Sequence, residues 1–510
     1  MKKVLFIYPN VANWAIIGTA VPILAGLAKK HNWSMEYFDT FRYEKERDST
    51  IDKETAGGFK PGFSKQKTKQ LPHDNIILDL QSKIKSFRPD LVAVTGLSHD
   101  YEFFMSFFPK IKLPEKTIVA IGGICTNMAP DDIAKTKMFD LINLGEGEET
   151  FAEILTNLEK NKTLKNISGT YFVDKKTGKI IKNPRRLVLK PEATWKTEQD
   201  FSFFNNNYFI RPFDGKMIRR YDVEVGRGCP FNCNYCGNSV LKKLFQGYGN
   251  YIKTRPLDSI FKHIKKMIKK YKIDVFQFTD ECFMSRPNSW LEEFGKRYAE
   301  ECKKPFIATA RAEVITAEKI KILLKYNAPF QISVGVESGS EHILNEICNR
   351  QCKTKQIIKA FDLLHKFKVR TNAFFMLGLP YETRKDLFKT VELCRRIKPS
   401  VSSISIFQPL PGQALTQLCI EKGFITGKEP MNTFTSGSSL KMPAPYLSAR
   451  EIVNFWRVFA LYCSLPKKYF PQIELCENDF NSNKKLFESL VALRWKSYDY
   501  SQKRDEMRVV

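Results

Sequence analysis

Residues 226–237 read Gly226-Arg227-Gly228-Cys229-Pro230-Phe231-Asn232-Cys233-Asn234-Tyr235-Cys236-Gly237. The stretch carries three cysteines in a C-x3-C-x2-C spacing, so three thiolates lie on one short loop. They can hold three irons of a [4Fe-4S] cubane and leave the fourth iron open, whereas a cluster that only carries electrons has four protein ligands. An open iron is a place where a molecule can bind and be reduced.

Zinc is the alternative interpretation, because cysteine pairs also build structural zinc sites. A closed zinc site needs a fourth ligand, and the next cysteine or histidine downstream is His263, outside the loop. The spacing therefore favours a cluster on Cys229, Cys233 and Cys236. A zinc-stabilised nucleic-acid-binding protein without catalysis is the alternative of another class.

The loop resembles the cysteine loop of the radical S-adenosylmethionine (SAM) superfamily. In that family SAM chelates the fourth iron, and the reduced cluster splits SAM into methionine and a 5′-deoxyadenosyl radical. The resemblance implies an enzyme with a [4Fe-4S] cluster and SAM as cofactors, with the three cysteines as its catalytic and metal-binding residues. It implies SAM contacts for Tyr235 and Gly237, and an electron donor such as flavodoxin or ferredoxin.

Composition limits the class of protein. The chain has 510 residues, too many for one ordinary core, so several domains are expected. Its 12 cysteines are dispersed, unlike a secreted disulfide framework, and predict a reducing, cytoplasmic location. The net charge of +27 is compatible with an anionic partner, but the lysines are scattered and favour solvated faces. No nucleic acid is indicated, and peripheral membrane contact stays open.

Residues 4–28 carry no charge and imitate a signal or membrane segment. Pro9, Asn10, Asn13 and Pro22 interrupt the run and are poor choices for a spanning helix. We therefore expect a strand, a loop and a helix, and no transmembrane segment.

The first 155 residues predict a doubly wound parallel sheet, because continuous apolar strands alternate with helices. The strands are expected at 4–8, 34–38, 90–96, 117–123 and 140–144, with a charged inserted loop at 42–73. Ligands of such sheets bind beyond the carboxyl ends of the strands. The residues at those ends are Pro9, Asn10, Thr95, Ser98, Gly122 and Gly123. No G-x-G-x-x-G follows the first strand, so a dinucleotide is not indicated.

This order of motifs resembles the cobalamin-binding domain that is fused to many radical SAM proteins. The resemblance implies that the corrin faces the carboxyl edge of the sheet and contacts the six residues just named. The loop from Asn10 to Gly18 lacks the cobalt-ligating histidine of the mutases. His99 is the one histidine near the edge, and we expect it to have a surface or packing role.

Residues 216–412 alternate again between strands and helices. The six strands, expected at 223–226, 275–279, 306–310, 331–336, 370–377 and 403–407, fall short of the eight of a complete barrel. A partial (β/α)6 barrel fits, and it is the radical SAM core. The family's SAM contacts then correspond to residues at the strand ends, namely Asp280, Glu281, Arg311, Glu337, Ser338 and Gly378. Each of these alone is compatible with a strand-end turn or an ordinary ion pair.

We therefore expect an α/β fold in four parts: a cobalamin-binding-like domain at 1–155, a connector with a hairpin at 156–215, the radical SAM core at 216–412 and a mostly helical extension at 413–510. The resemblance implies a cobalamin-dependent radical SAM methyltransferase that acts on an unactivated carbon of a small-molecule or natural-product-like substrate. Relatives with the same parts catalyse cyclisation, oxidation or rearrangement, with or without cobalamin. A methylthiotransferase is disfavoured, because only Cys125 precedes Cys229.

Overall fold

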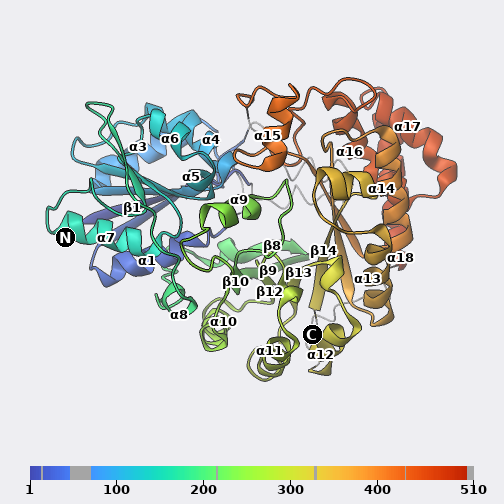
Figure 1. The fold of residues 1–510 in the computed structure, drawn as a ribbon, viewed down its shortest axis with the longest axis horizontal. Helices are drawn as coiled ribbons and strands as arrows, with labels where there is room; N and C mark the ends of the chain where they lie inside the picture. The colour runs from blue at the N-terminus through green and yellow to red at the C-terminus, as the bar shows by residue number, and fades with distance from the viewer. Residues whose placement is uncertain (13–14, 46–69, 214–215, 327–329, 431, 502–510) are drawn as a thin grey trace.

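A computed structural model describes residues 1–12, 15–45, 70–213, 216–326, 330–430 and 432–501 (Figure 1). Two mainly parallel sheets form the centres of an N-terminal and a C-terminal half. Residues 46–69, most of the insertion expected at 42–73, lie outside the described residues.

The first sheet has seven strands in the order β2-β1-β3-β4-β5-β6-β7. Its parallel strands are β1 (Lys3–Tyr8), β2 (Ser34–Asp39), β3 (Leu91–Gly96), β4 (Ile118–Gly123) and β5 (Leu141–Asn143). The strands β6 (Thr170–Val173) and β7 (Ile180–Lys182) form an antiparallel hairpin at its edge. The hairpin expected in the connector therefore extends the first sheet.

Helices cover both faces of this sheet. One face packs against α1 (Ala20–Lys30) and α7 (Glu148–Glu159), and the other against α3 (Asn75–Phe87), α4 (Ser98–Phe107) and α6 (Pro130–Lys135). Neighbouring side chains of a strand point to opposite faces. Phe6 of β1 therefore enters the first core and Ile7 the second, which explains the uninterrupted apolar strands of the sequence.

The second sheet is the partial barrel. Its order is β16-β15-β14-β13-β12-β9-β8. The parallel strands are β9 (Lys216–Val223), β12 (Val275–Phe278), β13 (Phe306–Arg311), β14 (Phe330–Glu337), β15 (Arg370–Leu377) and β16 (Val401–Ile406). The strand β8 (Ile210–Phe213) runs antiparallel to β9 at the edge. The expected fold, a doubly wound sheet followed by a partial (β/α)6 barrel and a helical extension, is confirmed.

One expected strand was misplaced. The prediction put the first barrel strand at 223–226, but β9 ends at Val223, and Gly226–Arg227 forms the short strand β10, which pairs with β11 (Lys253–Thr254). Residues 216–223 include several charged side chains and lack the apolar run of a buried parallel strand. The strand β9 pairs on one side with the antiparallel edge strand β8, and only part of β9 is buried. Its sequence therefore contains charged residues in place of a continuous apolar run.

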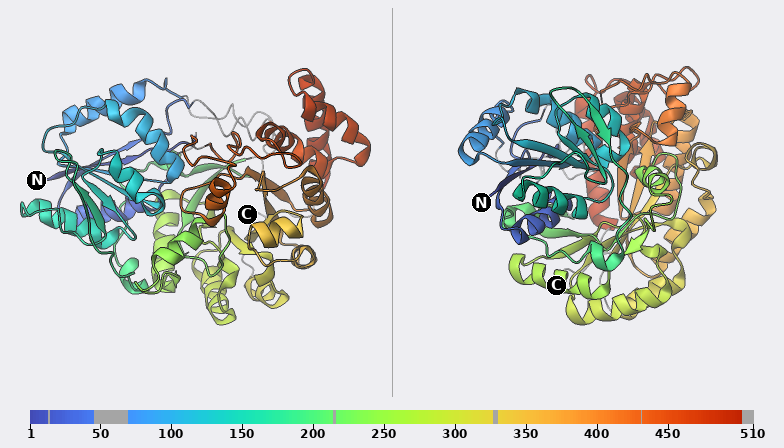
Figure 2. Two further views of the ribbon diagram at one scale, coloured as in Figure 1. Left: turned by 45° about the horizontal axis from the view of Figure 1, so that its top comes forward. Right: turned by 60° about the vertical axis from the view of Figure 1, so that its left-hand side comes forward.

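Helices surround the partial barrel and extend it at one end. Those that follow its strands are α10 (Leu257–Tyr271), α11 (Asn288–Glu301), α12 (Ala317–Lys325), α13 (Thr354–Lys366) and α14 (Arg384–Ile397). The extension contributes α15 (Ala414–Glu421), α16 (Ala449–Ser464), α17 (Phe470–Asn478) and α18 (Lys484–Ser501). The last three helices lie at the far end from the first sheet, whereas α15 lies between the halves (Figures 1 and 2). Among the described residues, no helix is long and apolar enough to cross a membrane.

The two halves pack closely. The short helix α9 (Gly237–Leu244) faces α5 (Ile124–Met128), and a Cβ on Gly237 would lie 2.8 Å from Met128 Cε. A Cβ on Gly145 would lie 3.1 Å from Phe245 Cε1. The connector, which includes α8 (Pro191–Thr194), crosses α1, where Asp200 N donates to Pro22 O at 2.8 Å.

A substitution at Gly26 of α1 tests this packing, because a Cβ at this position would overlap the backbone oxygen of Glu198. Backbone on both sides leaves no side chain to move away, so Gly26→Ala should lower the free energy of unfolding by about 1–3 kcal/mol. Chemical denaturation of the purified protein measures it. Lys30→Ala, exposed on the same helix, is the control and should change stability by less than about 0.5 kcal/mol. Equal stability of the two variants would contradict the close contact.

Candidate functional site

The cysteine loop lies between β10 and α9 and is anchored by its own backbone. Asn234 N donates to Cys348 O at 3.0 Å, and Leu415 N donates to Asn234 O at 3.1 Å. Gly228 has a φ of +85°, and a Cβ there would lie 2.9 Å from Tyr251 O, so this position requires glycine. The loop is thus clamped between the segment that follows β14 and the start of α15.

The three thiols lie on one loop. All are free; Cys233 is buried, and Cys229 and Cys236 are half-buried. Within the described residues, no three Cys, His, Asp or Glu side chains converge as ligands of one metal ion. A [4Fe-4S] cubane takes one thiolate on each iron, so three thiolates would leave one iron open.

Arg311, at the end of β13, contacts the loop. Its Nη1 lies 3.1 Å from Cys233 Sγ, and its guanidinium lies over the ring of Phe231, 3.9 Å from the centroid. Its Nε donates to Glu313 at 3.1 Å, and its Nη2 donates to Glu313 and to Arg350 O. The structure therefore places Arg311, which the sequence had assigned to SAM, against Cys233 of the cysteine loop.

Arg350 joins Tyr235 to the end of β14, and sequence reasoning missed it. Its Nη1 donates to Tyr235 Oη at 2.7 Å and to Glu337 Oε1 at 2.9 Å, and its Nη2 donates to Gly335 O at 2.8 Å. Glu337 has a φ of +65°, which is strained for a residue other than glycine. Burial raises the pKa of Glu337, while the charge of Arg350 lowers it.

The two acidic residues after β12 have different surroundings. Asp280 is buried, accepts from Val225 N at 3.2 Å and pairs with Arg286. Burial raises the pKa of Asp280 to about 6 against the effect of Arg286. Glu281 is exposed, and its charge adds to burial in raising the pKa of Cys236 to about 11. Of the pair, Glu281 is the one beside the thiols.

Ser338 and Gly378 are not brought to the cysteine loop. Ser338 is fully buried, its Oγ lies 3.3 Å from Thr390 Oγ1 and it accepts from Ser340 N at 3.2 Å. Gly378 has a φ of +73°, and a Cβ on it would lie 2.8 Å from Ile452 Cγ2 of α16. Both residues shape strand ends against neighbouring helices.

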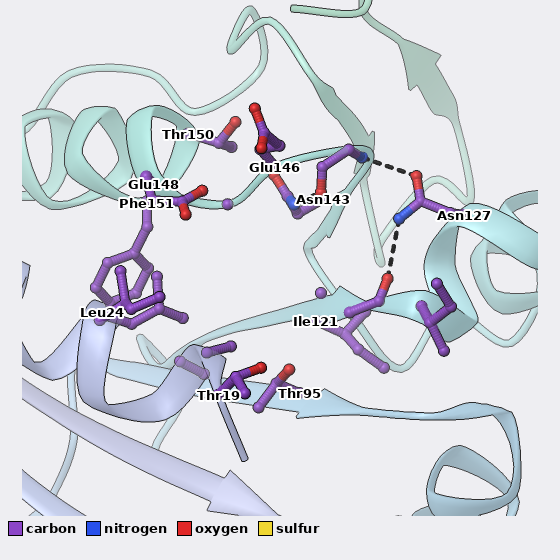
Figure 3. Close-up of a pocket in the computed structure, with 18 of the residues that line it drawn as sticks. Thr19, Leu24, Thr95, Ile121, Asn127, Asn143, Glu146, Glu148, Thr150 and Phe151 are labelled. Carbon is purple, nitrogen blue, oxygen red and sulfur yellow. Dashed lines mark hydrogen bonds between the residues drawn. The ribbon is translucent and has the colours of Figure 1, made fainter. Parts of the chain in front are cut away.

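A cavity of about 250 Å³ opens at the carboxyl edge of the first sheet (Figure 3). Of the residues expected at this edge, Thr95, Gly122 and Gly123 line it. Pro9, Asn10 and Ser98 do not line it: Asn10 Oδ1 accepts from Ala12 N at 2.8 Å, and Ser98 is buried at the start of α4. His99 packs edge-on against Phe434, with ring centroids 6.0 Å apart.

The cavity continues between the sheet and two helices, a part that the sequence did not reveal. Leu24 of α1 and Thr150 and Phe151 of α7 form this wall (Figure 3). At the rim, Asn127 Nδ2 donates to Gly123 O at 3.0 Å, and Gly145 N donates to Asn127 Oδ1 at 2.8 Å. The helical periodicity of the sequence predicts that these positions are buried in the core. It does not distinguish residues that line a cavity from residues that pack against one another.

A network of mostly half-buried charges joins this cavity to the cysteine loop. Arg227, two residues before Cys229, donates to Glu146 at 2.8 Å, to Glu148 at 2.7 Å and to Glu224 at 3.0 Å. All four of these charged residues line the cavity, as do Phe245 and Tyr251 from beyond α9. The cavity and the cysteine loop therefore share a wall.

Comparisons with known proteins agree with this geometry. Residues 223–394 match the Radical SAM superfamily. The chain is 24% identical to an uncharacterized methyltransferase of Pyrococcus horikoshii, over 70% of this chain and 74% of that protein. It is 22% identical to the anaerobic magnesium-protoporphyrin IX monomethyl ester cyclase of Cereibacter sphaeroides, over 66% of this chain and 54% of that protein.

Two solved structures share the fold. The radical SAM methyltransferase TsrM from Kitasatospora setae, with cobalamin and a [4Fe-4S] cluster bound, has a TM-score of 0.61 and 14% identity, covering 83% of this chain and 75% of its own. The cobalamin-dependent S-adenosylmethionine radical enzyme OxsB, with aqua-cobalamin and SAM bound, has a TM-score of 0.63 and 14% identity. The match covers 98% of this chain and 72% of the OxsB chain. Residues 223–394 thus match the radical SAM superfamily, and the chain has the two-part fold of these two enzymes.

Proposed function

We propose that the protein is a cobalamin-dependent radical SAM enzyme that methylates an unactivated carbon of a small molecule. The observation that carries the proposal is the wall that the first cavity shares with the cysteine loop through Arg227 and Tyr251. Cofactors held on the two sides of this wall are neighbours. The methyltransferase named among the relatives and the fold shared with TsrM support the same function.

The residues present fit these cofactors. Cys229, Cys233 and Cys236 would hold the cluster, and the exposed carboxylate of Glu281 would bind the ammonium group of SAM. Glu337, Tyr235 and Gly237 lie around the same loop. When bound, the cofactors supply a carbon-centred radical and a transferable methyl group. Arg350 holds the Tyr235 ring and the Glu337 carboxylate in fixed positions next to that chemistry.

The first cavity has the features of a site for part of cobalamin. At Gly122 the edge is open, because a Cβ there would make only an ordinary contact of 3.5 Å with Asn143. Asn143 Oδ1 is buried without a hydrogen-bond partner in the described part of the chain, so a donor on a ligand would satisfy it. Leu24 and Phe151 give this space an apolar wall against which part of the corrin could pack.

The remaining expectations belong to the same proposal. We infer a cytoplasmic enzyme, because 12 free cysteines require reducing conditions. A one-electron donor such as flavodoxin or ferredoxin would reduce the cluster. We propose the division at residues 155, 215 and 412, with a connector whose hairpin extends the first sheet and whose strand β8 extends the second. We propose that the extension helps to select the substrate.

Non-methylating carbon–carbon bond formation is the second candidate, favoured by the cyclase among the relatives. It uses the same cofactors and differs in the fate of the SAM methyl group. Transfer of a labelled methyl group from SAM to product distinguishes the two.

Cys233→Ala should reduce the formation of 5′-deoxyadenosine from SAM to background, because two thiolates do not retain the cluster. Chromatography of the reaction of reconstituted, dithionite-reduced enzyme measures it. Cys302→Ala, a buried cysteine at the end of α11, is the control and should keep the activity. Undiminished product from Cys233→Ala would exclude the assigned cluster.

Arg311→Met should lower the reduction potential of the cluster, because hydrogen bonds and positive charge near the sulfurs favour the reduced form. A redox titration followed by electron paramagnetic resonance measures the shift, at matched iron and sulfide content. Arg311→Lys keeps the charge and should lie between the wild type and Arg311→Met. An unchanged potential in a fully loaded Arg311→Met protein would contradict the role of the 3.1 Å contact with Cys233 Sγ.

Gly122→Trp should abolish cobalamin binding and leave the cluster intact, because the indole would fill the 250 Å³ cavity. Gly122→Ala is the matched control, since its methyl group fits at 3.5 Å from Asn143 Cβ. Cobalt content and the visible spectrum after reconstitution report both. Full cobalt occupancy in Gly122→Trp would show that cobalamin binds elsewhere.

A further inference from the structure

The first cavity is connected to one of the three thiols through a single amide side chain. Tyr251 is half-buried and lines the cavity, where its ring stacks on that of Phe245 with centroids 5.0 Å apart. Its hydroxyl donates to Oδ1 of Asn238, the second residue of α9, at 3.3 Å. Nδ2 of Asn238 in turn donates to Cys236 Sγ, at 3.9 Å. Asn238 therefore joins a tyrosine on the cavity wall to a cysteine of the loop.

The chemistry of the two ends fixes the orientation of this amide. A thiolate on Cys236 accepts hydrogen bonds and has no hydrogen to donate, so it must face the NH2 group of Asn238. Oδ1 of the amide then faces Tyr251, whose hydroxyl is the donor that this oxygen requires. The side chain of Asn238 is 9% exposed, so water is a poor substitute for that hydroxyl. Tyr251 thus holds the N–H groups of Asn238 toward Cys236.

An N–H group next to a cluster sulfur affects the reduction potential. Reduction adds one negative charge to the cluster, and hydrogen bonds to the sulfurs stabilise the more negative form, so they raise the potential. Arg311 faces Cys233 in this way from the partial barrel. Asn238 faces Cys236 from α9, and its other partner lies on the wall of the first cavity. Of these two donors, Asn238 is the one that a molecule in the cavity can influence.

A packing role alone does not account for these contacts. Asparagine near a helix start commonly bonds to the neighbouring backbone, whereas the side chain of Asn238 bonds to the side chains of Tyr251 and Cys236. The ring of Tyr251 is held without its hydroxyl. It stacks on Phe245 on one side, and a Cβ on Gly228 would lie 3.1 Å from its Cδ1. The hydrogen bonds therefore add orientation of the amide to a ring that is already packed.

We propose that Asn238 is a positioning residue for the cluster and that Tyr251 makes its effect depend on what occupies the first cavity. A molecule in the cavity would contact Tyr251 and lower the local dielectric around the two hydrogen bonds, which strengthens them. No atom is transferred along this link: it changes the potential at which the cluster takes up one electron from its donor. That the occupant is cobalamin rests on the function proposed above; the contact of Asn238 with Cys236 does not.

The test uses the full-length protein reconstituted with iron, sulfide and hydroxocobalamin, and redox titrations followed by electron paramagnetic resonance. Asn238→Leu, which is similar in size and has no hydrogen-bonding group, should lower the reduction potential of the cluster. Tyr251→Phe keeps the ring on the cavity wall and should lower the potential by a smaller amount. Tyr248→Phe is the control and should match the wild type, because Tyr248 packs in the same apolar cluster as Tyr251 but does not line the cavity.

The same titrations without hydroxocobalamin test the link to the cavity. Cobalamin should shift the potential of the wild type and of Tyr248→Phe, and Tyr251→Phe should reduce this shift at least twofold. Two results would overturn the inference. One is equal potentials in the wild type, Asn238→Leu and Tyr251→Phe at matched iron and sulfide content, and the other is an equal cobalamin shift in the wild type and Tyr251→Phe.

Two further measurements separate this inference from the proposed function. Tyr251→Phe removes one hydroxyl group and should fold even where Asn238→Leu does not, so the titration of Tyr251→Phe decides in that case. Iron, sulfide and cobalt contents are determined for every sample. A wild type that takes up no cluster or no cobalt would reject the proposed function and the inference with it, whereas full loading with unchanged potentials would reject the role of Asn238 and Tyr251 alone.

Discussion

The arrangement of the two halves depends on the half-buried guanidinium of Arg227. It is shared by Glu146 and Glu148 of the N-terminal half and by Glu224 at the start of the core. Charges with reduced access to water are tolerated when they are paired, so removing one partner should destabilise the network. Lys253 contributes a second cation, 2.5 Å from Glu146. This network fixes how the first sheet meets the partial barrel.

The same residue fixes the start of the cysteine loop, because Arg227 precedes Cys229 by two positions. The other end of the loop is fixed by α9, whose first residue, Gly237, packs on Met128 of the N-terminal half. The loop that would hold the cluster is therefore held at both ends by contacts between the halves. A molecule in the first cavity would contact Arg227 and also Phe245, the residue that follows α9.

The sequence predicted those features of the fold and the site that depend on residues close together in the chain. The cysteine spacing, the apolar strands and the strand-end glycines are all read from neighbouring residues. Arg350 could not be predicted, because its partner Tyr235 is 115 positions away and only the fold joins them. Ser338 was expected at the mouth of the barrel, but a register shift between Gly335 and Glu337 interrupts the alternation of β14, and Ser338 is buried. A bulge leaves no reliable signal in a single sequence.

The helix α9 explains why two cavities lie next to one loop. Leu241 and Phe245 are four positions apart, so they share a face, and both line the first cavity. Lys243 lies between them in sequence, points away from that face and lines a second cavity, of about 860 Å³, between the two halves. One helix thus forms a wall of both cavities, and its N-terminus begins at the last cysteine of the loop. Because the cysteine loop also contributes Asn234 to the second cavity, a reactive species formed at the loop would lie between the two spaces. The geometry therefore keeps two separate cavities beside the same three thiols.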